Sequence, residues 1–351
     1  MTVKGAKSNR FSTKCRLITA LLVSALLLPG CGHGTVPELS AGNSETAVTT
    51  GQDSISYVFD QHAYPAILED CCPEEYRDSF FNLCDALCEG KDTFECSNKE
   101  AYAFCMDPET LNQLYPAACG QISAGDRAFE NGTGHIRYEK SAGEFMERQK
   151  AFQNDISALI NRYIKPDYTD FEKCLVLYDY MTSEYQFDHM GEVRQFDGGT
   201  VYSCFELKKG ICSDLGALYA YLLMECGVDA VAVENAGAQT GAGYHAWTYV
   251  RLGGEGFHID VSSALKDETG LPRSLMDYFM MTDTDRSSYG GYIPEETQIP
   301  LISGGSAKDL TISSGSTKHR QPEWSYCTGY DTDRNIIYYT DSNGDHEFIY
   351  E

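Results

Sequence analysis

The sequence is short of positive charge. Among its 351 residues, 27 Lys and Arg stand against 52 Asp and Glu, which gives a formal net charge of −25 at pH 7. A protein without a basic patch lacks the main electrostatic attraction to the phosphates of DNA or RNA. We therefore expect no nucleic-acid partner, and we interpret the acidic excess as a feature that keeps a monomeric protein soluble outside the cell.

The sequence also lacks an apolar run long enough to cross a membrane. The apolar run of residues 17–28 has 12 residues, whereas a membrane-spanning helix needs about 20. The run follows five basic residues and ends in Leu-Pro-Gly-Cys, an arrangement typical of a secretory signal. This ending resembles the bacterial lipobox, in which the cysteine is acylated and becomes the mature N-terminus. We predict a lipoprotein signal peptide over residues 1–30 and a lipid anchor at Cys31 that holds the protein to the cell membrane, outside the cytoplasm. Plain secretion is the alternative.

The 14 cysteines include no C-x-x-C pair. This absence argues against a disulfide oxidoreductase and against most zinc sites, so we expect no metal and no cofactor, with zinc as a minor alternative. Seven cysteines fall between Cys71 and Cys119, and outside the cytoplasm such a density indicates disulfides. Setting aside Cys15, Cys31 and Cys212 leaves 11, so at least one stays unpaired in a monomer.

The chain after the signal divides by composition and periodicity. Residues 31–54 contain Gly, Ser, Thr and acidic residues without periodicity, which predicts a flexible tether. Residues 55–140 form a Cys-rich region that we expect to be mostly helical, because residues 74–89 place apolar side chains along one helical stripe. A core is predicted over residues 141–290, and residues 291–351 are predicted to form a polar linker and a C-terminal β-hairpin.

Two helices are expected at the start of the core. Apolar residues recur at helical spacing over residues 141–164 and again over 171–185. Cys174 lies among apolar neighbours in the second helix and is interpreted as a small buried hydrophobe.

The C-terminal hairpin is predicted from its turn. Asn343-Gly344 suits a type I′ turn between two aromatic-rich strands. The acidic run of residues 331–335 begins like a calcium loop, but Ile336 stands where such a loop needs glycine. We interpret the run as a solvated turn.

The stretch of residues 210–263 contains three side chains whose chemistry fits together. Gly210 can take a tight turn, and apolar residues at helical spacing then continue as far as Gly227. This pattern predicts a helix that starts at or near Cys212 and ends at Gly227. Unpaired N–H groups and the positive end of the helix dipole stabilise a thiolate, which is the nucleophilic form of cysteine.

Three strands are predicted after this helix, at residues 229–235, 244–252 and 256–261. If Gly253-Gly254 forms a two-residue hairpin turn between the last two strands, Asp260 faces Trp247, and His245 lies one diagonal step away on the same face. A carboxylate beside this imidazole would orient the ring and favour its protonated form, leaving it able to take a proton from the thiol.

Each of these residues has an ordinary alternative. Cys212 could instead form a disulfide. Asp260 could instead cap the end of a strand, but Asp is disfavoured by propensity on an interior strand, so its presence there points to function. His258 is the rival to His245. It lies farther down the hairpin, opposite Tyr249, and we interpret it as a strand side chain.

The pattern resembles the transglutaminase-like superfamily. The matching pieces are Gly-Ile-Cys-Ser-Asp at 210–214, Tyr-His-Ala-Trp at 244–247 and His-Ile-Asp-Val-Ser at 258–262. Flanking segments at 177–188 and 278–283 also fit the family pattern. The resemblance implies an α+β, papain-like fold, in which a cysteine at a helix N-terminus meets a histidine and an aspartate on an antiparallel sheet.

The same resemblance implies acyl transfer by Cys212, His245 and Asp260 on a peptide or protein substrate. The thiolate would attack an amide carbonyl, the imidazole would protonate the departing amine, and the thioester would be resolved by water or by an amine. The backbone N–H of Cys212 is the expected oxyanion donor. Tyr202 is a second candidate, with simple packing as its alternative. The alternative function is a catalytically inactive binding module of the same shape on the cell surface.

Overall fold

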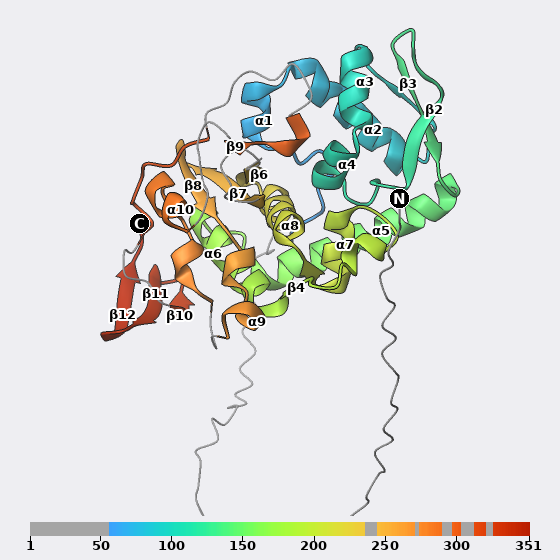
Figure 1. Cartoon of the computed structure of the whole chain (residues 1–351). Helices are drawn as coiled ribbons and strands as arrows, with labels where there is room; N and C mark the ends of the chain where they lie inside the picture. Colours follow the sequence, from blue (N-terminus) through green and yellow to red (C-terminus); the bar gives the residue numbers. More distant parts are fainter. Residues whose placement is uncertain (1–55, 236–243, 271–273, 290–296, 303–311, 321–325) are drawn as a thin grey trace, which may run out of the picture. The chain divides into compact units, whose positions relative to one another are not determined.

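The computed structural model describes residues 56–235, 244–270, 274–289, 297–302, 312–320 and 326–351 (Figure 1). The predicted signal peptide, Cys31 and the predicted tether lie outside these residues. Asp53–Glu351 form one compact unit. Among the described residues, no helix combines the length and the apolar character that a membrane span requires.

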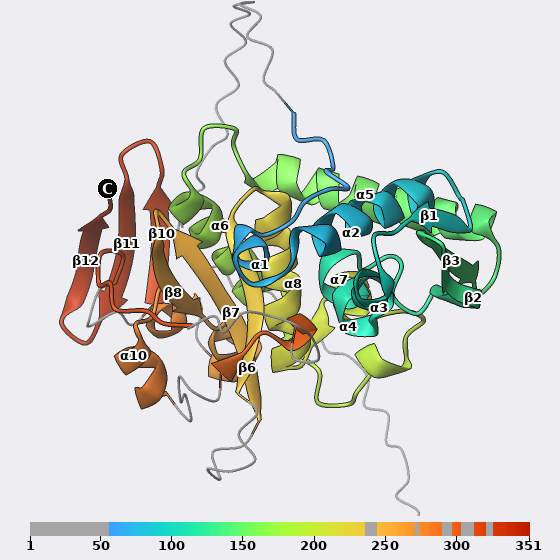
Figure 2. The same cartoon turned by 90° about the horizontal axis from the view of Figure 1, so that it is seen from above.

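A four-stranded antiparallel sheet lies at the centre of the described chain, with the strand order β8-β7-β6-β9 (Figures 1 and 2). Its strands are β6 (Asp229–Asn235), β7 (His245–Leu252), β8 (Glu255–Ile259) and β9 (Thr297–Gln298). Leu252 pairs with Glu255, so Gly253 and Gly254 form the two-residue turn, both with positive φ, as a type I′ turn requires. The three predicted strands and their turn are confirmed. β9 comes from the segment predicted to be a polar linker.

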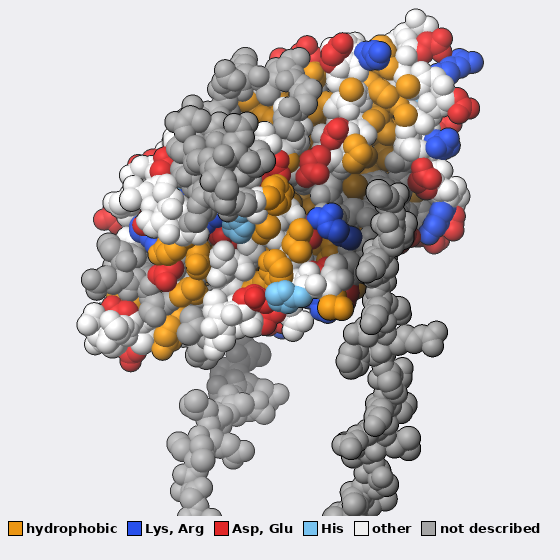
Figure 3. All heavy atoms as spheres, viewed as in Figure 1, with side chains coloured by type: hydrophobic (Ala, Val, Ile, Leu, Met, Phe, Trp, Pro, Cys, Tyr) orange, Lys and Arg blue, Asp and Glu red, His pale blue; other side chains and the backbone are white. Residues whose placement is uncertain are grey.

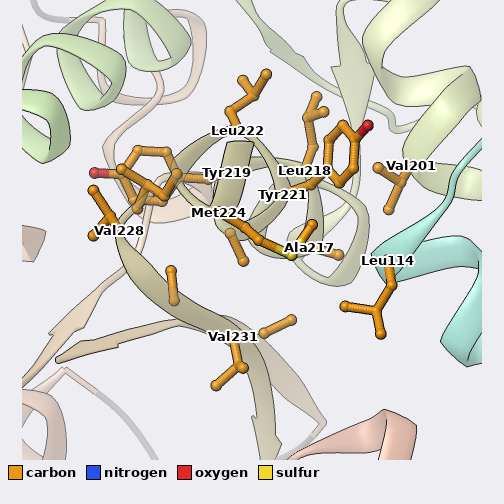
Figure 4. Packing of buried hydrophobic residues seen from close by; sticks show 14 of the residues in the cluster. Leu114, Val201, Ala217, Leu218, Tyr219, Tyr221, Leu222, Met224, Val228 and Val231 are labelled. Carbon is orange, nitrogen blue, oxygen red and sulfur yellow. The ribbon is translucent and has the colours of Figure 1, made fainter. Parts of the chain in front are cut away.

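Helix α8 (Cys212–Glu225) packs against this sheet and is buried from Asp214 to Glu225 (Figure 4). Gly216 allows the close approach, because a Cβ at this position would meet the backbone of Trp247 in β7 at 3.1 Å. Thr248 in β7 donates a hydrogen bond from its hydroxyl to the Gly216 carbonyl at 2.7 Å. The helix that begins with Cys212 is therefore fixed against the strand that begins with His245.

Further helices surround α8, namely α5 (Ala142–Tyr163), α6 (Asp170–Glu184) and α7 (Thr200–Leu207). Ser141 caps α5, and Thr169 and Glu172 form a capping box at α6, which satisfies N–H groups that a helix start leaves unpaired. The predicted helices at 141–164 and 171–185 are confirmed. Cys174 is fully buried, as predicted, and its carbonyl accepts a hydrogen bond from Tyr219 of α8 at 2.7 Å.

The Cys-rich region contains α1 (Ala66–Cys71), α2 (Glu74–Cys88), α3 (Lys99–Met106) and α4 (Pro108–Leu114). The helix predicted at 74–89 is confirmed as α2. The region also contains a three-stranded sheet of β1 (Thr93–Glu95), β2 (Ile122–Glu130) and β3 (Thr133–Tyr138), which the expectation of a mostly helical region did not include.

Disulfides are not formed among the described residues. None of the twelve cysteines of the described chain, from Cys71 to Cys327, is joined to another in a disulfide. Most of them are buried in the hydrophobic core, where each acts as a small apolar side chain. The density of cysteines in the sequence therefore reflects core packing in this structure, and the expected disulfide framework is not seen.

The C-terminal segment differs from its prediction in two places. A third strand, β10 (Tyr326–Asp331), pairs with β11 (Ile336–Asp341), which pairs in turn with β12 (Gly344–Ile349). The hairpin turn is Ser342-Asn343, because Asp341 pairs with Gly344, and neither turn residue has the positive φ of a type I′ turn. Within the acidic run of residues 331–335, residues 332–335 form the turn between β10 and β11, as predicted, and Asp331 ends β10.

Part of the predicted polar linker packs on the core. Within residues 312–320, Ile312 and Ser314 are buried. The Ser314 N–H donates to the Asp283 carboxylate at 2.7 Å, and Arg320 donates to the carbonyls of Met276 and Phe279.

The short elements that complete the described chain are β4 (Gln186–Phe187), β5 (Lys209–Gly210), α9 (Lys266–Thr269), α10 (Asp283–Ser288) and 3₁₀ turns at Val193–Gln195, Ser262–Ala264, Met276–Tyr278 and Pro300–Ile302.

Candidate active site

Cys212 is the first residue of α8, as the sequence predicts. Gly210 precedes it in β5, which pairs in parallel with β4 and fixes the chain before the helix starts. Gly210 does not adopt a positive φ. It is needed for space, because a Cβ there would lie 2.8 Å from the sulfur of Cys204 and 3.0 Å from the Cβ of Asp214. The predicted tight turn at Gly210 is therefore replaced by close packing.

The thiol of Cys212 is half-buried, and the N–H groups of the first helical turn lie around it. The backbone of Ile211 is extended at φ −85° and ψ 179°, so the chain enters the helix abruptly at the cysteine. Asp214 accepts a hydrogen bond from the Ile211 N–H at 3.1 Å and holds this entry in place. The backbone N–H of Cys212 stands in the first turn of α8, where N–H groups have no partner within the helix.

His245 begins β7, and Asp260 directly follows β8. Thr248 pairs with Ile259, so one further step of the ladder sets Asp260 opposite Trp247, as predicted. The His245 Nε2 lies 2.7 Å from the Asp260 Oδ2. This contact leaves Nδ1 as the other ring nitrogen, and the thiol of Cys212 lies near enough to the imidazole to raise its pKa.

The pKa of His245 is raised to about 9. Burial alone lowers it, because a buried imidazolium loses its hydration, but the hydrogen bond to Asp260, the nearby Cys212 thiol and the Asp260 charge outweigh that effect. The nearby Arg286 charge acts in the opposite direction. The imidazole is therefore held in its protonated form near neutral pH.

Asp260 is fully buried and almost fully hydrogen-bonded. Its Oδ1 accepts from the Ser262 hydroxyl at 2.8 Å and the Ser263 N–H at 3.2 Å, and its Oδ2 accepts from the Ser263 hydroxyl at 2.8 Å. Although burial raises the pKa of this carboxyl, His245 and Arg286 hold it well below its usual range. Asp260 is thus a fixed anion behind the imidazole.

Arg286 was missed by the sequence analysis. It lies in α10 with 1% of its surface exposed, and its guanidinium is stacked 4.5 Å from the centre of the Trp247 ring. Its Nη1 lies 3.5 Å from the Asp260 Oδ2. Its segment is polar and carries no motif, so the sequence offers no signal that would have found it.

His258, the rival histidine, is built into the core. It pairs with Tyr249, as predicted, and is fully buried. The Trp247 indole donates to its Nδ1 at 3.0 Å, and its Nε2 lies 2.9 Å from Asp283. Both ring nitrogens are engaged away from the thiol, so the interpretation as a strand side chain is confirmed.

Tyr202 contacts other groups than the site residues. Its ring packs on Phe152 with centroids 5.1 Å apart, and Arg148 lies 3.6 Å above it. These contacts favour the packing alternative over a role as oxyanion donor.

The comparisons with known proteins concern the part of the chain that carries this site. Residues 157–261 match the transglutaminase-like superfamily. This segment belongs to that superfamily. The transglutaminase-like segment contains the three site residues and the α+β arrangement of helix and sheet that the sequence predicted.

No curated protein sequence matches the chain. One solved structure, named "Putative Cysteine Protease from Cytophaga hutchinsonii", aligns with 13% identity over 33% of this chain and 39% of that chain, with a TM-score of 0.27. The chain thus spans about two fifths of that protein, and a likeness of this strength supports no argument about the site.

Proposed function

We propose that the protein is a cysteine-dependent acyl-transfer enzyme that cleaves or transamidates amide bonds in peptides or proteins. The observation that carries the proposal is the position of His245, whose Nε2 lies 2.7 Å from the Asp260 carboxylate and whose pKa is also raised by the nearby thiol of Cys212. Nucleophile, proton carrier and orienting carboxylate are in the order that this chemistry requires.

Each residue has a defined role in the proposed reaction. The Cys212 thiolate attacks the amide carbon, and a C–S bond forms while the carbonyl oxygen becomes an anion beside the Cys212 N–H. His245 gives its proton to the departing amine as the C–N bond breaks. Water or a second amine then attacks the thioester, loses a proton to His245, and releases Cys212.

The surroundings of the protein belong to the proposal as well. We place it outside the cytoplasm, attached to the membrane by a lipid at Cys31, where a peptide or protein substrate would reach the thiol from the medium.

Selective alkylation tests the proposal. The purified protein is treated with iodoacetamide at mildly acidic pH, and the modified residue is identified by mass spectrometry. We expect modification at Cys212, and its loss in the His245→Ala variant, because the imidazolium stabilises the thiolate. Cys226 is an internal control, because it is also half-buried but burial raises the pKa of its thiol to about 12.

A second assay distinguishes the outcomes of the reaction. A glutamine-containing peptide is offered together with a labelled primary amine, so that transamidation incorporates the label and hydrolysis yields the free acid. Equal alkylation of Cys212 with and without His245, and no turnover of any peptide, would favour the binding module instead.

A further inference from the structure

A cleft of about 820 Å³ opens beside the site residues. One wall contains Ser213, which directly follows Cys212, and Tyr244 and Ala246, which flank His245. The opposite wall comes from the Cys-rich region, through residues of α3 and α4. The lining therefore includes chain neighbours of Cys212 and His245, although Cys212, His245 and Asp260 do not line the cleft themselves.

The lining of the cleft is more acidic than the protein as a whole. Five carboxylates line it against a single guanidinium, that of Arg194, whereas the chain has about two acidic residues for each basic one. Acidic side chains are visible beside α4 on the face in Figure 3. The five are Glu100, Asp107, Glu109, Asp214 and Glu234.

The hydrogen bonds that these carboxylates accept within the described chain come from neutral donors. Glu109 accepts from the Gln113 amide at 2.7 Å, and Glu234 accepts from the Tyr244 hydroxyl and the Gln298 amide at 2.8 Å each. None of the five forms an ion pair with a Lys, Arg or His of the described chain. The Arg194 charge acts on Asp214 and offsets only part of the negative charge of the five.

The carboxylates also repel one another. Burial raises the pKa of Glu109, and the charges of Glu234, Asp107 and Asp214 raise it further. These four groups from α4, α8 and β6 therefore share one local potential. A cation that entered the cleft would relieve this repulsion, and its attraction would be stronger in the half-enclosed space than in open water.

The remaining lining indicates what kind of cation fits. Apolar groups contribute to the same cleft, namely those of Tyr76, Phe104, Leu301 and Ile302. An aliphatic stem with a charged end matches such a mixture of apolar wall and carboxylate. The carboxylates are too dispersed for a metal ion, since no group of three or more His, Cys, Asp or Glu in the described chain is placed to hold one.

We propose that the cleft binds the side chain of a lysine or arginine in a peptide substrate, close to the amide bond that Cys212 attacks. This inference rests on the proposed function for its reaction, but the binding itself does not depend on turnover.

Peptide binding to the Cys212→Ala variant is the first test. Fluorescent peptides that differ at one position, Lys against norleucine, are titrated at low and high salt. We expect the Lys peptide to bind about tenfold more tightly, with an advantage that shrinks as salt screens the charges. Equal affinity of the two peptides would overturn the proposal.

The acidic residues are then tested directly. In the double variant Glu109→Gln, Glu234→Gln we expect the preference for the Lys peptide over the norleucine peptide to fall about tenfold. The change should appear in the ratios of Kd and of KM for the two peptides and not in the ratio of kcat. Glu347→Gln is the matched control, because Glu347 is exposed on β12, away from the cleft lining. A preference that persists in the double variant would overturn the assignment to these carboxylates.

The cationic side chain bound in the cleft could belong to either of two substrates of acyl transfer, the acyl-donor peptide or the amine acceptor. A norleucine peptide is offered with the amide of Nα-acetyl-lysine as a separate amine. If the lysine derivative is only a competitive inhibitor, the cleft serves the donor peptide, as proposed; if it is incorporated into product, the cleft serves the acceptor and the proposal is overturned. Binding of the Lys peptide without turnover of any substrate by the unmodified protein would contradict the proposed function and leave the cleft assignment intact.

Discussion

His245 lies among charged groups that affect its pKa in opposite directions. Burial and the Arg286 charge lower it, while Asp260 and the nearby Cys212 thiol raise it. Tyr278, which also lies near Asp260 and Arg286, has its own pKa raised by burial and by the Asp260 charge. The site therefore depends on a balance of charges, and removal of any one of them should change the pH dependence of activity.

The pKa of His245 sets the expected pH profile of acylation. The raised value of about 9 means that the imidazolium persists through neutral pH and is lost as the pH rises through about 9. Amide turnover, measured as kcat/KM, should fall above that pH because the departing amine needs the proton. An ester substrate with a good leaving group should show a weaker decline. Amide turnover that still rises at pH 10 would contradict this assignment.

Arg286 offers a second test at this scale. In Arg286→Met, the charge that lowers the pKa of His245 is gone, so the alkaline limb of the kcat/KM profile should move to higher pH. We expect a loss of about 3 kcal/mol in stability, at the low end for a buried pair, because the Nε and Nη1 of Arg286 already lack hydrogen-bond partners within the described chain. Arg286→Lys should keep the limb in place. A purely structural role would reduce stability in Arg286→Met without moving the limb.

The three residues proposed for catalysis were found from sequence because each stands in a local pattern, a helix start or a glycine-bounded hairpin. Arg286 was not, because its position depends on how α10 packs over Trp247. Gly210 was found, but for the wrong reason, since only the folded chain shows how close Cys204 comes.

At the scale of elements, the contact between α8 and β7 fixes the distance between thiol and imidazole. Gly216 on the helix and Trp247 on the strand form the closest part of this contact. The helix and the hairpin could be predicted because their apolar periodicity and Gly-Gly turn are local signals. Other strands could not be predicted, because they depend on pairing with distant strands or show weaker alternation of apolar and polar residues; these are β2, β3, β9 and β10.

Gly216→Ala tests this contact. The added methyl would meet backbone atoms of Trp247 at 3.1 Å, and a central strand has little freedom to move away. We expect a loss of about 1–3 kcal/mol on denaturant unfolding, in spite of the better helix propensity of alanine, together with lower kcat. Gly143→Ala in α5 is the control, because nothing lies within 4 Å of its added Cβ. It should be neutral or stabilising by up to about 1 kcal/mol. Equal effects of the two changes would contradict the packing argument.

At the scale of the whole molecule, the first described residues are bound to the two helices that frame the core. The Ser56 hydroxyl and the Tyr57 N–H both donate to the Asn161 side chain of α5 at 2.8 Å. The Tyr57 hydroxyl donates to Glu225 at the end of α8 at 2.5 Å. The sequence did not predict this attachment, because it joins residues more than 100 positions apart.

Glu225 makes the stability of the fold depend on pH. Burial raises the pKa of this carboxyl to about 8, although the hydrogen bonds from Tyr57 and Tyr221 lower the pKa. A raised pKa in the folded state favours the protonated form, so its stabilising contribution is complete below about pH 4.5 and is lost as the pH rises through 8. The free energy of unfolding should fall over that window by up to about 5 kcal/mol. Glu225→Gln should remove this slope, and an unchanged slope would refute the assignment.

The attachment at Tyr57 has a mechanical consequence. A molecule pulled from its N-terminal side would load the bonds to Asn161 and Glu225 before any strand of the central sheet. Helix α8 carries Glu225 at one end and Cys212 at the other. If the bonds to Asn161 and Glu225 held, the pulling force would therefore act next on the helix that contains the thiol. In single-molecule stretching, an early small extension that frees residues 56–65 should therefore precede the unfolding of the sheet.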